Sequence, residues 1–296
     1  MTTAAASWSD CPQRMLFRVG AHTLGIDVDD DPARMVFNST YALLQCRSEH
    51  RAPHCTASLR RLADGRLHAR FGRHALPATA VTASDMRAAY VLAREMFARC
   101  ASGQDGSIAL YGALVGTLRG AVLLLGPAGI GKSVLALHLA QSGAEFLGDE
   151  TALLSLKTGE ISALPRRPAL RESALGVLPE ALRERVSRAP HVFQTERGRF
   201  WYALEETEID VAPSDRRLPL RAVCVVNGRG DDFSMQPLTV REAVPAVLQR
   251  AYARRSELAE ASAVRSALRG VACFNVVAAD PETSAREILR GLDACA

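Results

Sequence analysis

The sequence lacks long apolar runs and has few aromatic residues. Aromatic residues make up 5% of its 296 residues, and apolar stretches such as residues 121–125 are only long enough for a strand. A membrane-spanning helix needs about 20 apolar residues, so no membrane segment is predicted. The amino-terminal residues show no basic stretch followed by an apolar one, which argues against a secretion signal. We therefore expect a cytoplasmic protein.

Paired cysteine motifs are also missing. The seven cysteines are odd in number and scattered, and no Cys-x-x-Cys occurs, which argues for reduced thiols and against a disulfide scaffold or a structural zinc site. His50 and His54 have the spacing of metal ligands on a helix, and Cys55 follows them. Because Pro53 interrupts the segment and further ligands are missing, a solvated loop is the preferred interpretation.

Lysine is nearly absent. Of 36 basic residues only Lys132 and Lys157 are lysines, and the rest are arginines. Such a bias predicts that lysine persists mainly where arginine cannot replace it. The formal net charge of +4 is small and evenly spread, which argues against nucleic-acid binding. Hydrophobic residues at 48% and charged residues at 23% are typical of a globular chain.

The first part of the chain is predicted to be a small mixed α+β domain over residues 1–105. Short strands are expected at 15–19 and 35–37, a hairpin around Asp64 and Gly65, and a helix over 82–99. Residues 102–107 are polar and glycine-rich, and we expect them to form the linker to the second domain.

Residues 106–296 are predicted to form an α/β domain. Strand, loop, helix and strand follow one another between residues 121 and 147, as in a βαβ unit. Further strands are expected at 108–115, 152–156, 200–204, 221–226 and 271–277. Thr239 and Glu242 form a capping-box pattern that opens a helix, which Pro245 should kink. The last helix is expected to begin after Asp280 and to stop at Gly291.

The motif with the clearest chemistry is Gly-Pro-Ala-Gly-Ile-Gly-Lys-Ser at 126–133, which matches the phosphate-binding pattern G-x-x-x-x-G-K-[ST]. Glycines let backbone N–H groups turn toward phosphate oxygens, and the following helix N-terminus adds partial positive charge. Lys132 would bridge the β- and γ-phosphates, and the Ser133 hydroxyl would ligate Mg²⁺. A glycine-rich turn that binds nothing is the alternative. The candidate nucleotide-binding residues are Gly126, Pro127, Ala128, Gly129, Ile130, Gly131, Lys132, Ser133 and Val134.

Two adjacent carboxylates, Asp149 and Glu150, end the next apolar strand. They follow Lys132 so closely that only one helix and one return strand fit between, which brings the acids back beside the phosphate loop. A P-loop kinase needs one carboxylate for Mg²⁺ and one for the acceptor hydroxyl. An ordinary strand-end turn with solvated charges is the alternative.

Residues 110–175 resemble the catalytic domain of HPr kinase/phosphorylase, and more closely the HPr-kinase-related proteins of biosynthetic and other gene clusters. The resemblance rests on Leu-Tyr-Gly-Ala at 110–113, the phosphate loop, the segment 143–154 with its acid pair, and Leu-Pro-Arg-Arg-Pro-Ala-Leu-Arg at 164–171. It covers a little over a fifth of the chain and implies a P-loop kinase fold related to phosphoenolpyruvate carboxykinase.

The resemblance also implies ATP-dependent phosphorylation of a serine hydroxyl, with ATP and Mg²⁺ as cofactors. By position, Asp149 would be the base or the Mg²⁺-organising acid, Glu150 its partner, and Ser133, Asp149 and Glu150 the metal-binding set. Arg167 and Arg171 fall in a segment that lies near the active site in relatives, so the catalytic set becomes Lys132, Asp149, Glu150, Arg167 and Arg171. Relatives are often oligomeric, which makes a homo-oligomer an open expectation.

The sequence departs from this family in two places. Tyr111 stands where HPr kinases usually carry a histidine, so a proton relay through that position is lost. The family's phosphorolysis signature cannot be placed, because the similar segment at 269–276 lies about a hundred residues too late. The reverse reaction and HPr itself as substrate are therefore not expected. Some relatives phosphorylate peptide precursors such as those of lasso peptides, which keeps a peptide hydroxyl as a candidate acceptor.

Three functions remain open at this stage. The first is a kinase acting on a hydroxyl of a peptide, a protein or a small molecule. The second is a non-catalytic ATP-binding module that switches conformation for a partner. The third is an ATPase that releases phosphate without an acceptor. The short spacing from the loop to the acid pair favours the kinase.

Overall fold

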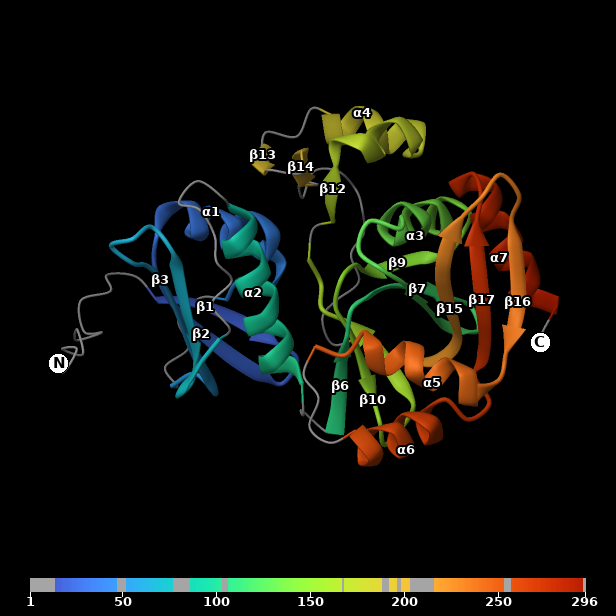
Figure 1. The fold of residues 1–296 in the computed structure, drawn as a ribbon, viewed down its shortest axis with the longest axis horizontal. Coiled ribbons are helices and arrows are strands. Elements are labelled where there is room, and N and C mark those ends of the chain that lie inside the picture. The colour runs from blue at the N-terminus through green and yellow to red at the C-terminus, as the bar shows by residue number, and fades with distance from the viewer. Residues whose placement is uncertain are drawn as a thin grey trace.

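The chain has a mixed α/β fold in which a smaller and a larger β-sheet lie side by side (Figure 1). The computed structural model describes residues 14–46, 52–76, 86–102, 106–166, 168–187, 192–195, 198–202, 216–252 and 257–294. Among these residues, no helix combines the length and the apolar character that crossing a membrane requires.

The smaller sheet comes from the amino-terminal part of the chain. Its five strands lie in the order β1-β2-β3-β4-β5, with β2 and β3 parallel and the other neighbours antiparallel. The elements are β1 (Arg14–Val19), β2 (His22–Asp29), α1 (Asp31–Thr40), a short 3-10 helix η2 (Ala42–Leu44), β3 (Cys55–Arg61), β4 (Leu67–Phe71), β5 (His74–Ala75) and α2 (Met86–Ala101). The aromatic rings of Phe17, Phe37, Tyr41 and Phe97 form the centre of its core, which α1 and α2 complete.

The predicted hairpin at Asp64 and Gly65 is confirmed, because β3 and β4 pair antiparallel on either side of it. The predicted strand at 35–37 is wrong, since these residues lie in α1. The Asp30 carboxylate caps this helix by accepting from the Ala33 N–H. Its buried residues Ala33, Val36, Phe37 and Thr40 follow helical spacing. The helix predicted over 82–99 is found as α2 from Met86 onward, and residues 82–85 lie outside the described residues.

The larger sheet has nine strands, and its long strand β15 (Leu218–Arg229) lies in the interior, where it pairs with β11, β8 and β17. The main path runs β6-β10-β11-β15-β8-β7-β9, and β17 pairs with β15 and with β16. The bounds are β6 (Ser107–Leu110), β7 (Gly112–Thr117), β8 (Gly120–Leu125), β9 (Glu145–Gly148), β10 (Ala152–Ser155), β11 (Glu160–Ala163), β16 (Ser234–Leu238) and β17 (Ala272–Ala278). β15 runs parallel to both β8 and β17, which forms the parallel centre of an α/β structure.

Helices cover both faces of this sheet (Figure 1). On one face α3 (Lys132–Gln141) packs against α7 (Pro281–Ala294), and their apolar residues share a core with Leu124 and Val226 of the sheet. On the other face α5 (Val240–Gln249) packs against α6 (Glu257–Ala267) in a second core. The strands between these layers are buried on both sides, as β8 is along its whole length.

Two helix-end predictions had different outcomes. The capping box of Thr239 and Glu242 opens α5 as predicted, and the helix continues through Pro245. The last helix begins after Asp280 as predicted, but it does not stop at Gly291 and continues to Ala294. Gly291 instead lies against Met235 of β16, where an added Cβ would come within 3.2 Å of the Met235 side chain. Close packing therefore accounts for this glycine.

A third sheet has three strands in the order β12 (Ala169–Arg171), β14 (Gly198–Tyr202) and β13 (Val192–Thr195). The 3-10 helix η4 (Glu172–Val177) and α4 (Glu180–Ser187) follow β12. Residues 103–105 of the predicted linker lie outside the described residues, and β6 begins at Ser107. The domain division at residue 105 stays a prediction, and Leu164 of the later part packs into the amino-terminal core.

Candidate functional site

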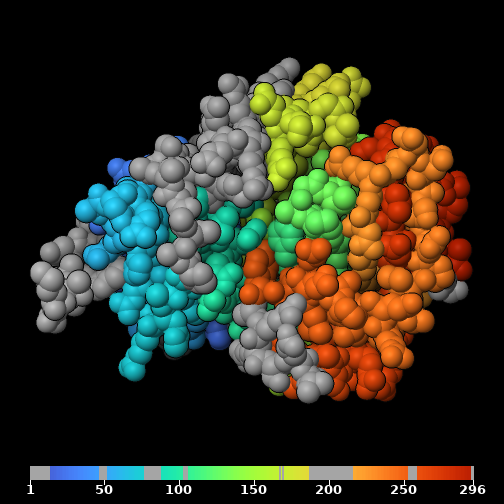
Figure 2. All heavy atoms as spheres, in the orientation of Figure 1, coloured from blue at the N-terminus to red at the C-terminus, as the bar shows by residue number. Residues whose placement is uncertain are grey.

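The glycine-rich loop lies between β8 and α3, so the predicted strand–loop–helix order is confirmed. Pro127, Ala128 and Gly129 are exposed, and the green segment reaches the surface between the yellow and orange segments (Figure 2). Gly131 adopts a φ of 104° at the N-cap of α3, a left-handed conformation that glycine tolerates best. The loop therefore presents its backbone to solvent at a helix N-terminus, the arrangement that favours an anion.

Lys132 is the first residue of α3 and turns back toward the loop. Its Nζ donates to the carbonyl oxygens of Gly126 and Pro127, at 3.0 Å each. Its side chain is buried, and this burial lowers the pKa of Lys132 to about 8. The Nζ also lies 4.4 Å from the centroid of the Tyr111 ring, a cation–π contact.

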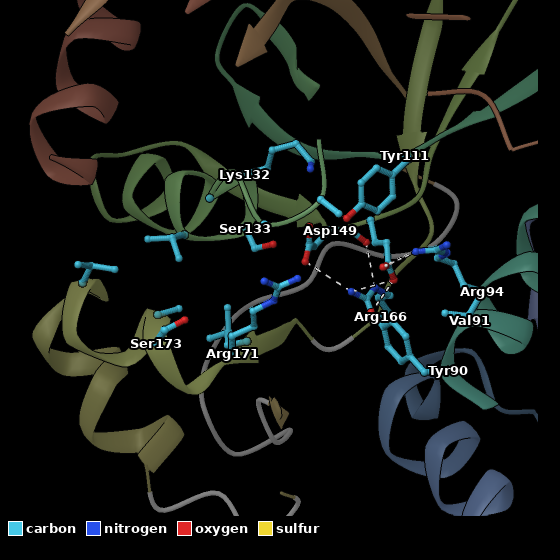
Figure 3. Close-up of a pocket in the computed structure, with 18 of the residues that line it drawn as sticks. Tyr90, Val91, Arg94, Tyr111, Lys132, Ser133, Asp149, Arg166, Arg171 and Ser173 are labelled. Atoms are coloured by element: carbon cyan, nitrogen blue, oxygen red, sulfur yellow. Dashed lines mark hydrogen bonds and ion pairs between the residues drawn. The ribbon is translucent and has the colours of Figure 1, made fainter. Parts of the chain in front are cut away.

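Asp149 lies beside the start of α3. It follows β9, which runs parallel to β8 but is separated from it by β7, so the return strand is not the direct neighbour of β8. The Ser133 hydroxyl lies close enough to the Asp149 carboxylate to lower the pKa of that acid. Burial raises the pKa of Asp149, against the opposing effects of Arg166, Ser133 and Lys132. The structure thus brings Lys132, Ser133 and Asp149 together, as Figure 3 shows.

Glu150 has a different environment from its neighbour. Its carboxylate accepts from the Tyr90 hydroxyl at 2.6 Å and from Arg94 Nη1 at 3.2 Å, and it lies 3.2 Å from Arg166 Nη2. Burial alone would raise the pKa of Glu150, but the attraction of Arg166 and Arg94 outweighs it, so the pKa is lowered. Both carboxylate oxygens are thus held by residues of the protein.

The backbone of Glu150 is also unusual. Its φ is 73°, and among the described residues it is the one non-glycine position with a positive φ. Its carbonyl oxygen accepts from the Tyr252 hydroxyl at 2.8 Å and from the Gly112 N–H at 3.3 Å. Such a conformation costs about 1–2 kcal/mol outside glycine, so the surrounding contacts must hold it.

Three arginines complete the site. Arg166 is almost fully buried, donates from Nε to the Asp149 carbonyl oxygen at 3.1 Å, and keeps its Nη1 without an acceptor among the described residues. Arg171 lies against the loop, where an added Cβ on Gly129 would meet its Nη1 at 3.1 Å. Arg229 donates from Nε to the Ile130 carbonyl oxygen at 2.9 Å. Arg167, the other predicted arginine, lies outside the described residues.

These residues line one cavity of about 360 Å³. Five basic side chains line it (Arg94, Lys132, Arg166, Arg171 and Arg229) against two acidic ones (Asp149 and Glu150). Of the predicted loop residues, Ala128, Gly129, Gly131 and Val134 also contribute to its wall. A concave site with excess positive charge concentrates anionic ligands.

The sequence analysis missed four residues of this site: Tyr90, Arg94, Arg229 and Tyr252. Arg229 ends β15, which is the parallel neighbour of β8, so an arginine at the end of an apolar strand was a usable signal. Tyr90 and Arg94 lie on α2 in the amino-terminal part, and nothing local in the sequence connects them to Glu150.

Comparison with known proteins leaves the family open. No protein-family model matches the chain, and no curated protein sequence matches it. Among solved structures, the Hpr(Ser) kinase/phosphatase from Coxiella burnetii aligns with a TM-score of 0.30 and 11% identity, over 62% of this chain and 98% of that chain. A likeness at this level does not assign a fold family or a function, so the resemblance seen in the sequence stays a prediction.

Proposed function

We propose that this protein is an ATP-dependent kinase that transfers the γ-phosphoryl group to a hydroxyl acceptor, most readily a serine of a peptide or protein. The observation that carries the proposal is the contact between Ser133 and Asp149 at the mouth of the glycine-rich loop, next to Lys132. Phosphoryl transfer needs these parts: backbone donors for the phosphates, a cation, and a carboxylate near the transferred group. The HPr-kinase-like motifs in the sequence support the same reading.

The arginines give the site its capacity for charge stabilisation. Arg171, at the end of β12, and Arg229, at the end of β15, both lie against the loop. Each places a positive charge beside the expected position of the phosphates. Arg166 keeps one buried N–H donor that the described protein does not satisfy. A buried donor without a partner costs about 1–3 kcal/mol, and an oxygen of the transferred group would satisfy it.

The donor set fits Mg²⁺ as the cofactor of this reaction. Ser133 and Asp149 supply two oxygen ligands that lie together, and Mg²⁺ prefers oxygen ligands from one or two side chains with the rest from phosphates and water. When bound, the ion would offset the phosphate charge. We assign Glu150 to positioning, because Tyr90, Arg94 and Arg166 hold its carboxylate.

In this proposal Asp149 orients the acceptor hydroxyl and takes its proton. Lys132, released from Gly126 and Pro127, would instead donate to the β- and γ-phosphates. Tyr111 packs on Lys132 and so limits where its ammonium can point. The acid and the loop are then arranged around one triphosphate.

The test is phosphate transfer from γ-labelled ATP to a library of serine-containing peptides and to a metabolite extract, read by mass spectrometry for an added phosphate. Asp149→Asn should lower transfer at least about 100-fold while ATP still binds, because it removes the base and a metal ligand. Lys132→Met should weaken ATP binding and transfer together. Lys157→Met is the matched control, since Lys157 is the only other lysine and is exposed.

The outcomes separate the proposal from its rivals. If ATP is hydrolysed to free phosphate at the same rate with and without any acceptor, the protein is an ATPase. ATP binding without transfer or hydrolysis, unchanged in Asp149→Asn, would indicate a nucleotide-dependent switch. A chain that binds no ATP, or an Asp149→Asn variant that keeps near-full transfer, would overturn the proposed site.

A further inference from the structure

Far from the loop, the smaller sheet gathers three metal-binding side chains from separate parts of the chain. His22 is the first residue of β2, Cys55 is the first residue of its parallel neighbour β3, and Cys100 lies near the end of α2. One ring nitrogen of His22 and the two sulfur atoms all lie within 4.8 Å of one another. The cysteines are thiols, with no disulfide between them.

We propose that His22, Cys55 and Cys100 bind a zinc ion. Two thiolates and one imidazole are a donor set that zinc takes in proteins, with a water molecule in the fourth position. Zinc–sulfur bonds of about 2.3 Å and zinc–nitrogen bonds of about 2.0–2.1 Å put tetrahedral ligand atoms roughly 3.5–4 Å apart. The cluster therefore needs to contract by only about 1 Å to close around the ion.

A second observation points to a ligand here. The Nδ1 atom of His22 is shielded from solvent and has no hydrogen-bond partner among the described residues. Buried polar atoms in native proteins nearly always have a partner, and one without a partner indicates a bound ion or water. No carboxylate takes part in the cluster, so hard ions such as Mg²⁺ and Ca²⁺ do not fit its donor set.

A neighbouring histidine orients one of the three proposed ligands. The His54 ring stacks on His22, with centroids 5.2 Å apart and 12° between the planes, and its Nδ1 accepts from the Thr23 N–H at 3.1 Å. His54 therefore acts as a positioning residue for His22.

The site would fasten α2 to the smaller sheet. Cys100 lies on α2, the same helix that carries Tyr90 and Arg94 to Glu150. Zinc would thus fix the end of a helix whose residues Tyr90 and Arg94 hold Glu150. The zinc proposal stands on its own geometry and does not depend on the proposed kinase activity.

The test is metal titration of the reduced wild-type protein, stripped with a chelator and kept in a phosphine reductant. Addition of Co²⁺ should give one equivalent of a tetrahedral thiolate complex, recognised by its sulfur-to-cobalt charge-transfer band, and Zn²⁺ should displace it. Cys55→Ser and Cys100→Ser should each weaken Co²⁺ binding about 100-fold or more, since even the loss of a residue behind a ligand costs about 10–100-fold. His54→Ala should weaken it about 10-fold.

Cys46→Ser and His74→Ala are the matched controls, because both residues belong to the same part of the chain and lie outside the cluster. Each should bind one Co²⁺ as the wild type does. Reduced wild-type protein that binds no Co²⁺ would overturn the proposal whether or not the serine variants fold. An equal loss of Co²⁺ binding in Cys46→Ser would overturn it as well.

Discussion

At the residue scale, two glycines that flank the loop and α3 are required for different reasons. Gly126 has a φ of 153°, and an added Cβ would lie 2.4 Å from the Val226 carbonyl oxygen of β15. Gly143, after α3, has a φ of 103° but no atom within 4 Å of an added Cβ. The first glycine is required by backbone contact and conformation together, and the second by conformation alone.

Gly143→Ala should therefore lower the free energy of unfolding by about 1–2 kcal/mol, the cost of a left-handed residue with a side chain. Gly126→Ala should cost a further 1–3 kcal/mol or so, because β15 must move away from the loop. Urea denaturation of both variants measures the difference. Equal losses in the two variants would contradict the contact between Gly126 and Val226.

At the element scale, α2 is the link between the smaller sheet and the acid pair. Tyr90 and Arg94 lie one helical turn apart, and both contact the Glu150 carboxylate. Arg166 reaches the same carboxylate from the chain that leads into β12. Glu150 is thus held between two elements that are distant in the sequence.

Arg94→Ala should lower the free energy of unfolding by about 3 kcal/mol, because it removes one partner of a buried carboxylate. Arg99→Ala on the same helix is the control, since its surface pair with Glu95 should be worth about 0.5 kcal/mol or less. Chemical denaturation compares the two. If Arg94→Ala is as stable as Arg99→Ala, then the contact between α2 and Glu150 does not stabilise the site.

At the scale of the whole molecule, the contacts of α2 couple the amino-terminal part to the nucleotide site. Asp149 and Glu150 are adjacent, so a ligand that orders Asp149 also restrains Glu150 and, through it, Tyr90 and Arg94. The cores of the two parts also meet where Leu164 packs among residues of the smaller sheet. Nucleotide binding at the loop should therefore restrain α2 in the amino-terminal part.

We expect MgATP to slow backbone hydrogen exchange in α2 as well as in the loop and α3. The protection of α2 should be lost in Arg94→Ala, while that of the loop remains, because only the former depends on the contact with Glu150. Hydrogen exchange read by mass spectrometry distinguishes these segments. Protection confined to the loop and α3 would show that the two parts respond independently.

Local sequence patterns were sufficient to predict several of the helices, strands and turns. The strand–loop–helix unit, the hairpin at Asp64 and Gly65 and the cap at Thr239 each depend on residues a few positions apart. The strand expected at 35–37 failed because three apolar residues carry no period, and the cap at Asp30 decided for a helix.

The nearness of Asp149 to Ser133 also followed from the sequence, because one helix and one strand leave the chain little freedom in where it returns. The strand between β8 and β9, the arginine at the end of β15 and the two α2 residues at Glu150 did not follow from it. The same holds for His22, Cys55 and Cys100, whose proximity depends on β2 pairing with β3 and on α2 packing against them. Contacts between distant segments arise only when whole elements pack, and no local spacing encodes them.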